Sequence, residues 1–206
     1  MKNTILKARP GFSLLEILIV VMIATSIVLV VSNLNGNVSL LNGLVSSELQ
    51  SKSDVNQTMQ IITAEIQSAA PSANGSYPID AASTSSFAFY ADINRDGGVE
   101  HIRYFIASSS IYKGVIEPTG TPATYPTSTE LVTDIIDKVV IPSSTPLFSY
   151  YDASYTGTQS PMSSPVIIQN IRLVQVAFLL QPSQTSTAVM PQAFSSLIDI
   201  RNLRSN

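Results

Sequence analysis

The most constraining feature of the sequence is a lone glutamate, Glu16, near the start of a long apolar segment. Residues 17–31 read ILIVVMIATSIVLVV, and residues 12–47 carry no other charge. An ionised carboxylate in hydrocarbon costs about 2.5–3.5 kcal/mol on insertion scales, so an acid in such a segment is a candidate functional residue. The length of the segment predicts a helix that spans a membrane at about residues 14–34.

A short polar leader, residues 1–11, precedes the apolar segment and contains Lys2, Lys7 and Arg9. Basic residues at this position favour a cytoplasmic N-terminus, so we expect the rest of the chain to lie outside the cytoplasm. No small-residue cleavage site follows the apolar segment, which makes a conventional signal peptide a poor fit. Cleavage after Gly11 would keep the apolar segment and create a new amino group at Phe12.

Gly11 followed by Phe12-Ser13-Leu14-Leu15-Glu16 resembles the prepilin motif of type IV pilins and type II secretion pseudopilins. The resemblance implies that a prepilin peptidase cuts after Gly11 and methylates the new N-terminal Phe12. It also implies that Glu16 is the assembly carboxylate, which meets the new amine of a neighbouring subunit. Pairing within about 4–6 Å favours the charged forms of both groups. Because Phe12 and Glu16 are one helical turn apart, pairing within a single subunit stays open.

A single long helix is predicted for residues 12–70, because no proline interrupts this segment and Pro71 supplies a stop. Residues 33–43 are rich in glycine and asparagine, which predicts either a bend or melted stretch or a site of close helix contact. The second half has an amphipathic pattern. Its apolar residues, at spacings mostly of three and four, are Leu41, Leu44, Val45, Leu49, Val55, Met59, Ile62 and Ile66.

Short apolar runs separated by Pro, Ser, Thr and Gly predict a β-rich domain in residues 71–206. The clearest unit is a hairpin of residues 86–91 and 99–106, joined by a turn that contains Asp96-Gly97. Further elements are expected at residues 130–140, 166–180 (broken near Asn170) and 194–200. The predicted fold class is therefore α+β, with a long N-terminal helix, membrane-spanning in its first half, packed on a C-terminal antiparallel β-sheet domain of pilin type.

The end of the chain adds to the resemblance. Residues 171–178, IRLVQVAF, and residues 197–203, LIDIRNL, are similar to the closing strands of J-type minor pseudopilins and W-type minor pilins. This similarity implies a minor component of a filament rather than its major subunit.

Asp92-x-Asn94-x-Asp96-Gly97 matches the opening of an oxygen-rich calcium loop. The match does not continue, because position twelve is Arg103, although Glu100 could close a shorter loop. Asp and Asn are also favoured in plain turns, where their side chains bond to their own backbone. Two interpretations stay open: a calcium site formed by Asp92, Asn94, Asp96 and Glu100, or a turn without any cofactor.

The sequence contains no recognisable catalytic motif. It has no cysteine and one histidine, His101, and it lacks a nucleophile elbow and a phosphate-binding glycine loop. We therefore expect a protein that is not an enzyme. The net charge of −3 gives no indication of nucleic-acid binding.

These observations predict a structural minor pilin or pseudopilin of a type IV pilus or type II secretion pseudopilus. Its expected partners are other pilin or pseudopilin subunits, the prepilin peptidase and an inner-membrane assembly platform. The expected location is the inner (cytoplasmic) membrane, crossed once, with the globular domain outside the cytoplasm. The alternative is a single-pass, membrane-anchored binding module, such as a receptor or adhesin, that does not assemble.

Overall fold

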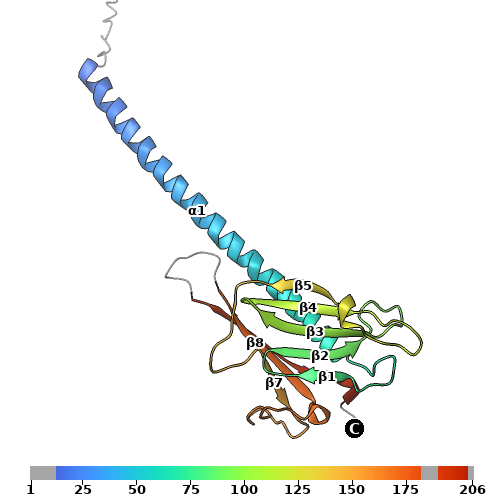
Figure 1. Ribbon diagram of the computed structural model, residues 1–206. Coiled ribbons are helices and arrows are strands. Elements are labelled where there is room, and N and C mark those ends of the chain that lie inside the picture. Colours follow the sequence, from blue (N-terminus) through green and yellow to red (C-terminus); the bar gives the residue numbers. More distant parts are fainter. Residues whose placement is uncertain (1–12, 182–189, 204–206) are drawn as a thin grey trace, which may run out of the picture. The chain divides into compact units, whose positions relative to one another are not determined.

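The computed structural model describes the backbone of residues 13–181 and 190–203, and all side chains in these ranges except those of residues 31, 33–45, 47 and 48. The chain divides into two compact units, residues 1–49 and residues 50–206. Helix α1, Leu14–Gln67, contributes to both units (Figure 1). It is helical through residues 33–43, so a melted stretch at that position is wrong.

The sequence predicted that the first half of the long helix, at about residues 14–34, spans a membrane. The structure corrects this prediction. Within the described part of the chain, no helix is long and apolar enough to cross a membrane. The second half of the helix was predicted to pack on the β domain, and its last turns do contribute Val55, Met59, Ile62 and Ile66 to the core of that domain.

The second unit contains a five-stranded antiparallel meander in the order β1-β2-β3-β4-β5, whose strands lie side by side in Figure 1. The predicted hairpin is confirmed: β2 and β3 pair in a register that sets Ala91 opposite Glu100. Strands β1 and β4 were absent from the predicted set, and β5 lies inside the expected element at residues 130–140. The strands are β1 (Ile79–Ala82), β2 (Ser86–Ala91), β3 (Glu100–Ala107), β4 (Ser110–Ile116) and β5 (Leu131–Ile136).

A second antiparallel sheet is organised around β8 (Leu173–Leu180), which pairs with β6 (Val139–Val140), β7 (Phe148–Tyr151) and β9 (Gln192–Asp199). The strand predicted at residues 166–180, broken near Asn170, is present only in its second half as β8; the first half contains a short 3-10 turn, η2 (Ile168–Asn170), and no strand. The predicted last strand corresponds to β9. Two further 3-10 turns are η1 (Thr127–Thr129) and η3 (Arg201–Leu203).

The core of the second unit forms where the last turns of α1 meet the inner faces of both sheets. Spacings of four, three and four residues place Val55, Met59, Ile62 and Ile66 on one stripe of the helix, and all four are buried. Aromatic residues join the two sheets: the Phe87 ring of β2 lies 6.0 Å from that of Phe148 and 5.7 Å from that of Tyr150, both on β7.

Polar contacts fix the position of this helical segment. Glu65 of α1 accepts hydrogen bonds from Lys113 Nζ of β4 at 2.6 Å and from the Tyr104 hydroxyl of β3. Burial and the adjacent Glu65 carboxylate raise the pKa of Tyr104 well above its usual value, so the hydroxyl stays a donor. Asn202 Nδ2 donates to the Ala69 carbonyl at 2.7 Å and thereby satisfies a backbone group just beyond the helix end.

Adjacent isoleucines on α1 provide a matched test of this packing. Ile62 is 2% exposed and Ile61 is 49% exposed. We expect Ile62→Ala to lower the free energy of unfolding by about 2–5 kcal/mol, because it removes buried methyl groups and leaves a cavity. Ile61→Ala should change it by less than about 0.5 kcal/mol. Urea denaturation measures both values, and equal effects would contradict the assignment of the buried stripe.

Candidate functional site

The prepilin-like site begins at the first turn of α1. Glu16 lies in this turn, where its backbone N–H donates to the Ser13 carbonyl at 3.0 Å. In the part of the chain that the structure describes, the Glu16 carboxylate has no hydrogen-bond or ion-pair partner and is exposed. Gly11 and Phe12 lie outside the described residues, so the predicted cleavage and methylation sites stay predictions. A carboxylate at a helix N-terminus is favoured by the helix macrodipole.

The helical surface that follows Glu16 consists almost entirely of exposed hydrocarbon. Exposed fractions in this segment range from 49% at Ile19 to 83% at Leu14. The hydroxyls of Thr25 and Ser26 donate to carbonyls of their own helix at 2.8–3.0 Å, so these polar groups need no external partner. We call this the apolar segment. Its exposed large side chains are Leu14, Leu15, Ile17, Leu18, Ile19, Val20, Val21, Met22, Ile23, Ile27, Val28, Leu29 and Val30.

A second candidate site is the acidic loop, residues 92–100, which joins β2 to β3. Its carboxylate residues Asp92, Asp96 and Glu100 each place one oxygen within 4.8 Å of the others. The structure therefore brings together the three carboxylates of the predicted calcium site. Asn94, the fourth predicted ligand, is hydrogen-bonded to Asp96 instead. The Asn94 amide oxygen accepts a bond from the Asp96 backbone N–H at 3.0 Å, and Asn94 Nδ2 donates to Asp96 Oδ2 at 2.9 Å.

Local hydrogen bonds hold the two aspartates of the acidic loop in place. Asp92 accepts bonds from the backbone N–H groups of Arg95 at 2.6 Å and Gly97 at 3.2 Å. Asp96 Oδ1 accepts a bond from the Gly98 N–H at 2.7 Å. Gly97 has a φ of +88°, a left-handed conformation that favours glycine. These contacts are those of a well-formed turn, and they agree with both interpretations left open by the sequence.

Glu100 differs from the two aspartates because it is fully buried. Its exposed fraction is 0%, Oε2 accepts a bond from the Ile93 N–H at 2.9 Å, and Oε1 has no hydrogen-bond partner. Burial raises the pKa of this carboxyl; the bond from Ile93 opposes the rise, and the nearby Glu117 and Asp96 add to it. A raised pKa of an acid means that its ionised form is disfavoured in the folded state.

His101 follows Glu100 on β3 and pairs with an acid. Its Nε2 lies 3.0 Å from Asp80 Oδ2, and its ring packs edge-on against Tyr90 with centroids 5.1 Å apart. Its Nδ1 is buried and has no hydrogen-bond partner, so no serine is engaged on the second nitrogen. The residue thus lacks the nucleophile of a hydrolase triad. That the protein is not an enzyme stays a prediction.

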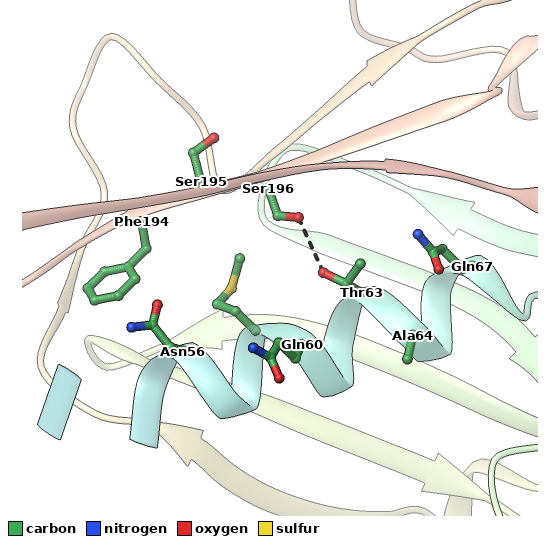
Figure 2. Close-up of a pocket in the computed structure, with 9 residues that line it drawn as sticks. Asn56, Gln60, Thr63, Ala64, Gln67, Phe194, Ser195 and Ser196 are labelled. Atoms are coloured by element: carbon green, nitrogen blue, oxygen red, sulfur yellow. Dashed lines mark hydrogen bonds between the residues drawn. The ribbon is translucent and has the colours of Figure 1, made fainter. Parts of the chain in front are cut away.

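A groove of about 590 Å³ lies between the last turns of α1 and β9. Figure 2 shows Thr63 of the helix and Ser196 of the strand pointing toward each other, and their hydroxyl oxygens are 3.2 Å apart. The lining carries neutral amides, hydroxyls and apolar groups but no titratable side chain, so it offers no acid–base chemistry. Its lining residues are Asn56, Met59, Gln60, Thr63, Ala64, Gln67, Phe194, Ser195 and Ser196.

No protein-family model matches the chain, and no curated protein matches it. The resemblance to pilins and pseudopilins therefore depends on the residues of this sequence alone. The predicted filament function, the partners and the single-pass location stay predictions.

Two features of these sites were missed by sequence reasoning. The burial of Glu100 follows from strand alternation, because Glu100 occupies the same face of β3 as the buried Ile102 and Tyr104. That alternation was readable in the sequence, but the face that points inward was not. The pairing of His101 with Asp80 joins residues of β3 and β1, and no local pattern in the sequence indicates it.

Removal of the buried charge should stabilise the fold in metal-free buffer. We expect Glu100→Gln to raise the free energy of unfolding at pH 7 by about 1 kcal/mol, because an amide of similar shape costs less to bury than a carboxylate. Its amide oxygen can still accept the Ile93 bond. The control is Asp54→Asn, which removes an exposed acid of α1 outside the acidic loop and should change stability by less than about 0.5 kcal/mol. A loss of stability in Glu100→Gln, measured by chemical denaturation, would show that the carboxylate is not strained by burial.

Proposed function

We propose that this chain is a minor subunit of a type IV pilus or a related pseudopilus, processed after Gly11 and assembled through the apolar segment of α1. The observation that carries the proposal is the contrast within one helix. The turns that belong to the second unit bury their apolar stripe, as at Ile62 and Ile66, whereas residues 14–30 expose hydrocarbon that no described residue covers. Exposed apolar surface of this extent marks an interaction site.

The geometry of the apolar segment favours a helical partner. It is a regular helix whose hydroxyl groups are satisfied internally, so another apolar helix can pack against it without burying unpaired polar groups. Copies or relatives of this chain supply such a helix. Contacts between unlike surfaces of successive subunits extend into a helical filament when the rotation from one subunit to the next does not close into a ring.

Assembly that buries Glu16 depends on cleavage after Gly11. The Glu16 carboxylate has no partner among the described residues, and burying it between helices would cost several kcal/mol without one. Cleavage after Gly11 would create an ammonium group at Phe12 one helical turn away, on the same subunit or a neighbour. A cleaved subunit can therefore enter the filament with its charges paired, while the uncleaved precursor cannot.

The processing step can be tested by intact mass. When the chain is produced together with an active prepilin peptidase, we expect a product that begins at Phe12 and carries one added methyl group. A variant with Gly11→Ala should keep residues 1–11, whereas Gly36→Ala, a glycine substitution elsewhere in α1, should be processed normally. A wild-type chain that still begins at Met1, while a known substrate of the same peptidase is cleaved, would contradict the proposal.

If Glu16 pairs with the new amine during assembly, its substitution should leave cleavage normal and impair the later assembly step. Glu16→Gln should be cleaved normally but enter sheared filaments about tenfold less than wild type, because the new amine loses its charged partner. Asp54→Asn replaces another exposed acid of α1 and should leave incorporation unchanged. Immunoblots of filament and cell fractions give the ratio. Wild-type incorporation of Glu16→Gln would remove the assigned role from this carboxylate.

A further inference from the structure

The acidic loop contains a buried carboxylate, Glu100, that has no cationic partner among the residues that the structure describes. Glu100 Oε1 is shielded from solvent and unbonded, although buried polar atoms almost always have a partner. Leaving an ionised carboxylate in this state costs several kcal/mol unless a counter-charge is present. Of the residues placed by the structure, no Lys, Arg or His forms an ion pair with Asp92, Asp96 or Glu100.

The carboxylates next to Glu100 increase the free-energy cost of burying its ionised form. Oxygens of Asp92 and Asp96 lie within 4.8 Å of a Glu100 oxygen, so three negative charges share a small volume at the end of the β2–β3 hairpin. Backbone N–H groups and the Asn94 amide hold the two aspartates there, and each aspartate oxygen accepts one hydrogen bond, which leaves a second acceptor position on each. The loop thus places one oxygen of each of the three carboxylates within 4.8 Å of the others, with acceptor positions left on the aspartates.

We infer that the acidic loop binds one calcium ion through Asp92, Asp96 and Glu100. Calcium binds oxygen at about 2.3–2.6 Å, so two oxygens on opposite sides of the ion are at most about 5 Å apart, which accommodates the observed cluster. The ion takes six to eight oxygens in irregular geometry, and backbone carbonyls or waters would complete the set. Magnesium requires near-ideal octahedral geometry and keeps several waters, which fits three protein carboxylates on one short loop less well.

This site would act on the fold rather than on a substrate. Asp92 follows β2 and Glu100 begins β3, so an ion bound between them links the ends of two adjacent strands. The carboxyl of Glu100 lies on the same face of β3 as Ile102 and Tyr104, so its orientation is coupled to the core. Calcium would therefore stabilise the domain whether or not the chain assembles into a filament, and the inference does not depend on the proposed function.

The test uses the full-length chain in mild detergent, first stripped with EDTA. We expect calcium chloride to bind with one ion per chain in calorimetry and to raise the melting temperature by about 5 °C at about 5 mM calcium. Magnesium chloride at the same concentration should give a smaller shift. No heat and no shift with calcium would overturn the inference, and an equal or larger effect of magnesium would overturn the choice of calcium.

Two variants and a control locate the site. Glu100→Gln should remain folded in EDTA but lose the calcium-dependent shift, and Asp96→Asn should weaken calcium binding by about tenfold. Asp152→Asn is the matched control, because Asp152 also bonds within its own turn, accepting from the Ser154 N–H at 2.9 Å, but belongs to no carboxylate cluster. It should retain the full calcium response. A full response in Glu100→Gln, or loss of the response in Asp152→Asn, would contradict the assigned site.

Discussion

Burial of the apolar stripe on the last turns of α1 is the interaction on which the second unit depends. Both sheets contribute buried side chains to one core, and the stripe from Val55 to Ile66 enters the same core as the aromatic residues that join β2 to β7. Glu65 lies beside the stripe and is held by Lys113 and Tyr104, so an error in helical register would unpair a half-buried carboxylate and a buried hydroxyl. The apolar packing and the polar contacts thus favour the same position of the helix. The apolar stripe of these turns is buried within the chain.

Each of the two candidate sites contains a carboxylate that lacks a cationic partner in the described structure, and the partner that we propose differs between them. Glu16 and Glu100 are both carboxylates without a cationic side chain beside them in the described structure. Glu16 is exposed on an apolar helix, and its charge becomes costly only when that helix is covered, as it would be in the proposed assembly. Glu100 is already buried in the isolated domain and therefore needs a counter-charge before any assembly occurs. The ammonium group that cleavage would create at Phe12 can pair with Glu16, and a calcium ion can pair with Glu100.

Local chemistry explains which parts of the fold were predictable. The β2–β3 hairpin was found because Gly97 accepts the positive φ of the turn between two aromatic-rich runs, and β9 was found from its apolar alternation. Strand β7 was missed because Phe148–Tyr151 is buried at all four positions inside a stretch rich in Ser and Pro, so it shows no alternation. The clustering of Asp92, Asp96 and Glu100 was predictable from their spacing, whereas the unpaired oxygen of Glu100 depends on strand register and on the layers that cover it. The membrane-spanning assignment rested on hydropathy alone and was corrected.

Site-specific photo-cross-linking can detect whether the apolar segment of α1 is covered by the helix of another subunit, as we propose. A photoreactive benzoylphenylalanine at Val21, which is 55% exposed, should yield a cross-linked product with a second pilin-type subunit in filament-producing cells. The same group at Thr158, an exposed loop position, should yield far less. The product should disappear when Gly11→Ala blocks processing. Filaments that contain the Val21-labelled chain but give no intersubunit product, or a product that persists in the unprocessed variant, would contradict the account.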